Sequence, residues 1–153
     1  RPCAEGAGSR LVRALGIDLG DRRIGVAVSS GRVASPIETV ERSGDVARDH
    51  RRLLDLADEW EVDRLVIGLP LSLDGSEGPA ARKVLAEVAE LRALTPLPID
   101  TYDERLTTVT AAQRLQEGGV SARDRRRMID QLAATVLLQA WLDGRDDLPD
   151  PAP

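Results

Sequence analysis

The chain has 153 residues, enough for one domain with a substantial apolar core. Hydrophobic residues make up 42% of the chain and charged residues 31%, which is ordinary for a globular protein. No apolar run approaches the roughly 20 residues needed to span a bilayer, and no signal-peptide core is present. A single cysteine, Cys3, excludes an internal disulfide framework and fits a reducing compartment. A cytoplasmic protein without membrane contact is expected.

The net charge of −5 argues against a nucleic-acid binder that is basic over its whole surface. It does not exclude a nuclease, because active-site carboxylates and any bound metal must be counted locally. Arginine, which suits bidentate contact with phosphate, clusters at Arg22–Arg23, at Arg51–Arg52 and in residues 123–127. We therefore expect the distribution of charge, and not its total, to decide whether nucleic acid binds.

The elements expected along the chain follow from apolar spacing and turn signals. Residues 1–10 read as a flexible leader, residues 11–142 as one domain and residues 143–153 as an acidic flexible tail. The expected strands are residues 11–19, 24–30, 31–40, 65–69 and 97–102, and the expected helices are 45–60, 79–94, 106–117 and 125–142. Pro36 makes the third strand an edge or bulged strand. The order β-β-β-α-β-α-β-α-α predicts a three-layer α/β domain with a mixed central sheet.

One acidic residue, Asp18, lies in an apolar, glycine-bounded run over residues 15–20. The strand period of two places its side chain on the face opposite its apolar neighbours, with Gly16 and Gly20 on its own face. These glycines are expected to leave space for a metal and a phosphate to approach the backbone. The alternative is a carboxylate that caps a turn at the end of the strand.

A second acid, Glu104, closes the run over residues 98–104 and opens a loop. Asp103 and Glu104 alternate faces if the strand persists that far, so one of them is expected to point into a site; whether Asp103 also joins a metal site stays open. Either acid can instead favour the positive end of a following helix. Arg105 beside them can pair with a carboxylate or hold a phosphate.

A third acid, Asp130, lies in an apolar helical stretch over residues 128–134. Ala133 and Ala134, three and four positions later, lie on its own side of the helix. Their small side chains let the helix come close to the sheet and bring Asp130 within ligand reach of Asp18. The alternative is an acid near the helix start that the helix dipole stabilises. His50, the lone histidine, is expected to be solvated on the exposed part of its helix.

A carboxylate in an otherwise apolar element is costly unless a cation or hydrogen bonds compensate it. Three such carboxylates on separate elements suggest a shared hard divalent metal, Mg²⁺ or Mn²⁺. Two-metal phosphoryl chemistry needs oxygen ligands held on rigid elements, which a strand, a strand end and a helix can supply. The sequence therefore predicts a phosphodiester hydrolase with Asp18, Glu104 and Asp130 as catalytic residues and metal ligands.

Four segments, in this order, resemble the YqgF/RuvX family of pre-16S rRNA nucleases and Holliday junction resolvase homologues. They are Gly16-Ile17-Asp18-Leu19-Gly20 with Arg23-Ile24-Gly25-Val26-Ala27, Val66-Ile67-Gly68-Leu69-Pro70, Asp103-Glu104-Arg105-Leu106-Thr107-Thr108, and Ile129-Asp130-Gln131-Leu132-Ala133-Ala134. The first motif alone is weak, but the ordered set is specific.

The resemblance implies a ribonuclease H-like fold and a metal-dependent nuclease that uses two Mg²⁺ or Mn²⁺ ions. By motif match, Asp18 is the acid of the first strand, Glu104 the acid of the Asp-Glu-Arg motif and Asp130 the acid of the final helix. The residues for which it implies nucleic-acid contact are Arg22, Arg23, Arg105, Thr107 and, in the loop after Pro70, Ser72. The resemblance favours processing of the 5′ end of the 16S rRNA precursor, with structured RNA or branched DNA as the partner.

Three alternatives stay open. Resolution of a Holliday junction would need a symmetric dimer, and the sequence does not choose between monomer and homodimer. A nucleotide-binding phosphotransferase is suggested because residues 16–20 also resemble the first phosphate-binding hairpin of sugar kinases and actin-like ATPases. Those proteins have a second domain and a second phosphate loop, which this chain does not show. A non-catalytic RNA- or ribosome-binding protein is the third alternative, and the presence of all three acids argues against it.

Overall fold

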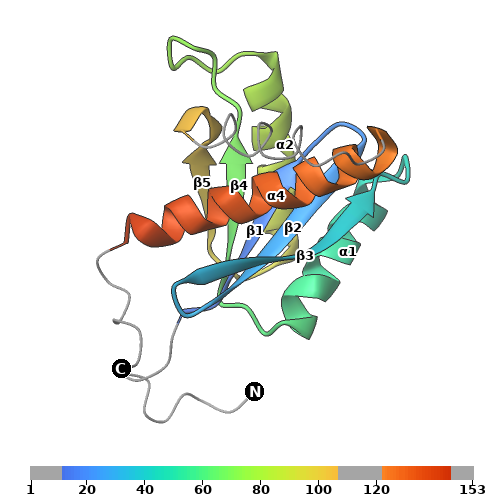
Figure 1. The fold of residues 1–153 in the computed structure, drawn as a ribbon. Coiled ribbons are helices and arrows are strands. Elements are labelled where there is room, and N and C mark those ends of the chain that lie inside the picture. Colours follow the sequence, from blue (N-terminus) through green and yellow to red (C-terminus); the bar gives the residue numbers. More distant parts are fainter. Residues whose placement is uncertain (1–11, 107–121, 146–153) are drawn as a thin grey trace.

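The structure, a computed structural model, describes residues 12–106 and 122–145, the side chains of residues 106 and 122–128 excepted. A five-stranded mixed sheet of order β3-β2-β1-β4-β5 forms its centre (Figure 1). The two hairpin contacts, β1–β2 and β2–β3, are antiparallel, whereas β1–β4 and β4–β5 are parallel. The elements are β1 (Ala14–Leu19), β2 (Arg23–Ser30), β3 (Val33–Glu41), α1 (Val46–Glu59), β4 (Arg64–Leu69), α2 (Pro79–Leu94), β5 (Ile99–Asp103), the 3₁₀ helix η2 (Glu104–Leu106) and α4 (Ala122–Asp143). The expected α/β class with a mixed sheet is confirmed.

Helices cover both faces of the sheet (Figure 1). Leu15 and Ile17 of β1 belong to the larger apolar core, which also contains side chains of α1 and α2. A smaller core joins the opposite face to α4 through residues such as Ala134 and Leu138. Since side chains of a strand alternate between faces, Asp18 lies on the α4 side of β1.

Most element boundaries lie close to their expected positions. β3 is an edge strand, and its register with β2 shifts where Pro36 pairs with Ala27, as a proline in a strand requires. α4 begins at Ala122, earlier than the expected start at Arg125. The helix expected over residues 106–117 lies outside the described residues except for Leu106, as do the leader and most of the tail. None of the helices in the described part of the chain combines the length and apolar character needed to cross a membrane.

His50 is buried, so its expected exposure on α1 is wrong. Its side chain is 1% exposed, and its Nε2 lies 2.8 Å from Oε1 of Glu87 on α2. The apolar pattern of α1 could not reveal this position, because the partner that makes burial of a polar ring acceptable comes from another helix.

Candidate active site

Two glycines on the neighbouring strands make room beside Asp18. Its antiparallel partner on β2 is Gly25, and Gly68 continues the parallel register on β4. A Cβ atom on Gly25 would collide with the backbone carbonyl of Asp130, and one on Gly68 would collide with the carboxyl group of Glu104. The missing side chains therefore let acids from β1, η2 and α4 approach one another.

The space expected beside Gly16 and Gly20 is occupied by other parts of the chain. A Cβ on Gly16 would lie 2.8 Å from Cβ of Leu138, because α4 covers this position. A Cβ on Gly20 would lie 2.5 Å from the carbonyl oxygen of Arg23 across the hairpin turn. The expectation that these two glycines admit metal and phosphate is wrong: one allows helix packing and the other a tight turn.

The carboxyl groups of Asp18 and Glu104 are hydrogen-bonded to each other. Burial raises the pKa of Glu104, and the charge of Asp18 and the hydrogen bond to it raise the pKa further, to about 8. Burial also raises the pKa of Asp18; the hydrogen bond from Glu104 opposes this rise, and the charge of Asp130 adds to it. Glu104 therefore holds a proton at neutral pH and donates it to the Asp18 carboxylate.

The carboxylate of Asp130 binds Arg23 at the start of β2. Nε of Arg23 donates to Oδ2 of Asp130 at 2.7 Å, and the two side chains are 21% and 22% exposed. The ion pair ties α4 to the strand beside Asp18. Among the residues that the structure describes, no three Asp, Glu, His or Cys side chains form a ready ligand set for one ion. The structure thus brings Asp18 and Glu104 into direct contact and places Asp130 nearby.

The Asp18–Glu104 pair fits a hard divalent cation. Both side chains offer carboxylate oxygens, the ligands that Mg²⁺ and Mn²⁺ prefer. Two carboxylates held together away from water are costly to ionise, as the raised pKa of Glu104 shows. A cation would offset the repulsion and displace the proton. Asp130 could add a third oxygen through Oδ1, because Arg23 binds only Oδ2.

Arg105 binds the acid that precedes Glu104. Its Nη2 donates to Oδ2 of Asp103 at 2.6 Å, and its Nη1 donates to the carbonyl oxygen of Leu73 at 3.2 Å. The hydrogen bonds from Arg105 lower the pKa of Asp103, whereas burial and the neighbouring Asp18 raise that of Glu104. Through its bond to Leu73, Arg105 also stabilises the loop that follows β4.

The other residues expected to contact nucleic acid are more scattered. Arg22 is exposed in the β1–β2 turn. Ser72 lies in the loop after β4, where its backbone N–H donates to the carbonyl oxygen of Ser76 at 2.9 Å. Thr107 lies outside the described residues. The turn and the loop follow β1 and β4, so Arg22 and Ser72 lie beyond the carboxyl ends of two adjacent parallel strands.

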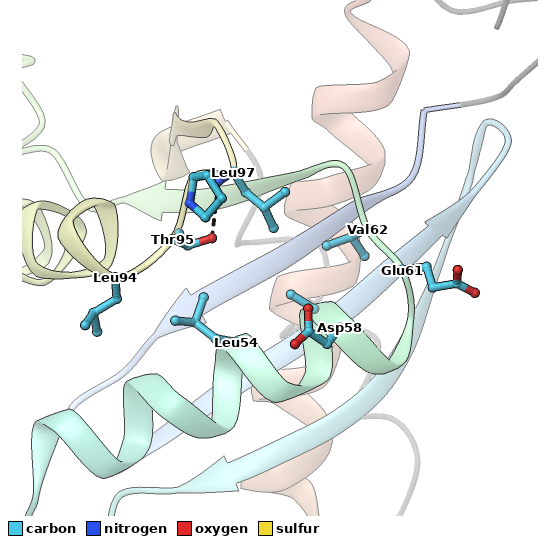
Figure 2. A pocket seen from close by; sticks show the side chains of 9 residues that line it. Leu54, Asp58, Glu61, Val62, Leu94, Thr95 and Leu97 are labelled. Atoms are coloured by element: carbon cyan, nitrogen blue, oxygen red, sulfur yellow. Dashed lines mark hydrogen bonds between the residues drawn. The ribbon is translucent and has the colours of Figure 1, made fainter. Parts of the chain in front are cut away.

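A pocket of about 450 Å³ lies between the C-terminal ends of α1 and α2 (Figure 2). Its lining is mainly apolar, with carboxylates from Asp58 and Glu61. It adjoins the segments that lead into β4 and β5, whereas Asp18 and Glu104 lie at the carboxyl ends of β1 and β5. Ligands of parallel α/β sheets bind outside the carboxyl ends of strands, so the pocket is separate from the carboxylate site.

Comparison with known proteins agrees with the motif resemblance. The RuvX family model, described as a Holliday junction resolvase, matches residues 12–144. A relative from Rhodococcus opacus, named "Putative pre-16S rRNA nuclease", is 49% identical over 139 residues, which cover 87% of this chain and 78% of that protein. A relative of the same name from Anaeromyxobacter dehalogenans is 46% identical over 136 residues, which cover 88% of this chain and 98% of that protein.

A solved structure of RuvC from T. thermophilus in complex with a Holliday junction substrate has a TM-score of 0.53 to this chain. The match covers 88% of this chain and 95% of RuvC at 15% identity, so the likeness is one of fold. RuvC has a ribonuclease H-like fold, and the expected fold is therefore confirmed. A family match from residue 12 to residue 144, with relatives that share nearly half of their residues with it, shows that the chain belongs to the RuvX family.

Proposed function

We propose that this protein is a metal-dependent nuclease that hydrolyses phosphodiester bonds in structured RNA and processes the 5′ end of pre-16S rRNA. The observation that carries the proposal is the hydrogen-bonded Asp18–Glu104 pair, whose raised pKa values mark two acids held together at an energetic cost. The names of the relatives support the choice of substrate. A ribosomal RNA substrate also implies a cytoplasmic location.

Asp18 and Glu104 would hold Mg²⁺ or Mn²⁺, with Asp130 completing the ligand set for two ions. When bound, such ions stabilise charge on the phosphate and activate water for attack. Glu104 must first lose the proton that it donates to Asp18, so metal binding and deprotonation are linked. Asp18 lies on a strand with a hydrogen-bonded neighbour on each side, which fixes the position of its carboxylate.

Arg23 is the group that a substrate phosphate would bind first. Its guanidinium matches phosphate in shape and charge, and its ion pair with Asp130 is accessible enough for a phosphate to compete. Transfer of Arg23 to phosphate would free the Asp130 carboxylate at the moment when substrate binds. Arg22, Arg105, Ser72 and Thr107 would contact the nucleic acid on either side, as the family resemblance implies.

The decisive experiment compares cleavage of structured precursor RNA and of a four-way DNA junction in Mn²⁺, Mg²⁺ or EDTA. We expect metal-dependent cutting by the wild type and its loss in Asp18→Asn and Asp130→Asn, with the circular dichroism spectrum unchanged. Asp55→Asn, which changes an exposed acid on α1, is the control and should cut normally. Wild-type cleavage by Asp18→Asn would remove Asp18 from the mechanism. Metal binding without cutting of either substrate would favour a non-catalytic RNA- or ribosome-binding role.

Holliday junction resolution is the second candidate, supported by the description of the family model and by the RuvC-like fold. A junction has two strands to cut in a symmetric arrangement, so this activity would require two copies of the chain. Preferential cutting of the four-way junction, with a homodimer in sedimentation, would favour it over RNA processing. Preferential cutting of the precursor RNA would favour the first proposal.

A further inference from the structure

Arg42, which follows β3, belongs to a partly buried polar network on the α1–α2 side of the sheet. Its Nη1 and Nη2 donate to Oε1 and Oε2 of Glu87 at 2.9 and 2.8 Å. Nε2 of His50 lies 2.8 Å from Oε1 of Glu87 and donates to it, because an ionised carboxylate only accepts. The three side chains are 15%, 17% and 1% exposed.

Glu87 and Arg42 stay charged although their side chains are largely shielded from water. Burial by itself raises the pKa of Glu87, but the hydrogen bonds from Arg42 and His50 outweigh burial and lower it. The bond to Glu87 in turn raises the pKa of Arg42. Buried ion pairs often stabilise a fold no more than apolar side chains of the same size would. Stability alone is therefore a weak explanation for three polar side chains at this place.

Arg42 also donates two hydrogen bonds to the β1–β2 turn. Its Nε donates to the carbonyl oxygen of Gly20 at 3.0 Å, and its backbone N–H donates to the carbonyl oxygen of Arg22 at 2.9 Å. The turn separates Asp18 at the end of β1 from Arg23 at the start of β2. A single residue thus binds two carbonyl groups, those of Gly20 and Arg22, in the segment that joins Asp18 to Arg23.

The backbone beside Arg42 is also anchored. The backbone N–H of Ser43 donates to Oδ1 of Asp49 at 3.1 Å, and Asp49 is 3% exposed. The other side-chain link from α2 to the turn, between Lys83 and Asp21, joins side chains that are 70% and 86% exposed. Exposed pairs of that kind contribute little. Among the described residues, the firmer of these two connections between the helices and the turn is therefore the one through Arg42.

We propose that Arg42, held by Glu87 and His50, is a positioning residue of the active site: it fixes the β1–β2 turn and through it the Asp18 and Arg23 side chains. This inference rests on the proposed nuclease function. Arginine is required because one guanidinium binds both Glu87 oxygens and still donates a further hydrogen bond to Gly20. The point charge of a lysine cannot form that planar set of contacts.

The test uses Arg42→Lys with Arg52→Lys as the matched control. Arg52 also binds a carboxylate in a bidentate manner: its Nε and Nη2 donate to the two oxygens of Glu38 at 3.0 and 2.7 Å. This pair joins α1 to β3, away from the turn. Hydrogen–deuterium exchange of residues 19–25 and steady-state cleavage of structured RNA in Mn²⁺ are measured for both variants. Glu87→Gln, which keeps an acceptor oxygen and loses the charge, provides a second variant should Arg42→Lys fold poorly.

We expect Arg42→Lys to exchange faster at the turn and to lose on the order of tenfold in kcat, because small displacements of reacting groups are costly. KM should rise by less than this factor, because Asp18 acts in the chemical step whereas Arg23 is one of several proposed phosphate contacts. Arg52→Lys should match the wild type in both measurements. Unchanged kcat and exchange in Arg42→Lys, or faster exchange spread over the whole chain, would overturn the inference. Absence of cleavage by the wild type would refute the proposed function instead, while the exchange data would still decide whether Arg42 fixes the turn.

Discussion

Glu104 is an acid whose ionisation is opposed by its surroundings. Burial and the charge of Asp18 keep its pKa near 8, so in the metal-free protein the Asp18–Glu104 pair shares one proton at neutral pH. The folded chain therefore binds a proton that the unfolded chain, with an ordinary Glu pKa of 4.5, has already lost. The stability of the protein must depend on pH through this one side chain.

The unfolding free energy of the metal-free protein should fall as the pH rises from about 4.5 towards about 8, because the folded state binds more protons over that range. One such group contributes at most about 1.4 kcal/mol per pH unit. Glu104→Gln removes the group, so the variant should gain stability relative to the wild type as pH rises. Urea unfolding in EDTA, followed by tryptophan fluorescence, checks this. Parallel pH curves for the two proteins would show that Glu104 titrates normally.

The sequence singles out the acids because Asp18 and Asp130 have apolar neighbours and Glu104 ends a predicted strand, but it does not reveal their partners. Arg23 and Asp130 are 107 positions apart and His50 and Glu87 are 37 apart, so no local pattern links them. A histidine in a charged run on a helix is usually exposed, and that general rule failed at His50 because the Glu87 carboxylate lies opposite it. Pairings of this kind can be recognised only once the fold is known.

At the scale of elements, the site depends on how closely α4 approaches the sheet. The backbone of Asp130 lies directly over Gly25, and Leu138 lies over Gly16. A residue with any side chain at these positions would push the helix away. Because α4 carries Asp130 and half of the smaller apolar core, its position affects both the stability of the fold and the geometry of the site.

Gly25→Ala should destabilise the protein by about 1–3 kcal/mol, the usual cost of overpacking a well-packed interior. The added methyl group would meet the backbone of Asp130, which cannot rotate aside as a side chain can. Gly144→Ala is the control, because its methyl group would lie 3.6 Å from the nearest carbonyl oxygen, that of Ala140. Thermal unfolding monitored by circular dichroism measures both changes. Equal stability of the two variants would mean that α4 can shift without cost.

The elements themselves were largely predictable. Strand alternation, Pro36 at the edge and the C-terminal apolar stripe each correspond to an element of the structure. The roles of the glycines were harder to predict. Gly16 and Gly20 flank Asp18 in the sequence, but they allow helix packing and a tight turn. An isolated glycine in the apolar run over residues 65–69 was the better signal, because it marks a close approach of other atoms to a strand. That glycine, Gly68, is where Glu104 packs.

Across the whole molecule, the candidate site residues lie at one end of the sheet, where the parallel strands have their carboxyl ends. Asp18 and Glu104 lie at the carboxyl ends of parallel strands, with Arg22 in the adjoining turn and Arg105 under the loop after β4. The protein as a whole is acidic, with a net charge of −5. We therefore expect this local group of arginines to contribute to the attraction of nucleic acid, and the exposed arginines of α1 not to take part.

Arg22→Ala should weaken RNA binding and reduce the slope of log K against log salt by about one, as expected for the loss of one phosphate contact. Arg51→Ala, which removes an exposed arginine of α1, should leave both the affinity and the slope unchanged. Fluorescence anisotropy of labelled RNA at several salt concentrations, in the Asp18→Asn background to prevent cutting, provides the measurement. A similar loss in both variants would indicate diffuse attraction and no localised binding edge.

The late position of α4 in the chain has a consequence for synthesis of the protein. All five strands are complete by Asp103, but Asp130 and the apolar side chains that cover the second face of the sheet belong to a helix that begins at Ala122. A ribosome releases these segments in order. A nascent chain that ends before α4 therefore has an uncovered sheet face and lacks Asp130, whose charge contributes to the raised pKa of Asp18. The proposed activity would be withheld until translation has delivered α4, because the Asp130 carboxylate arrives only with that helix.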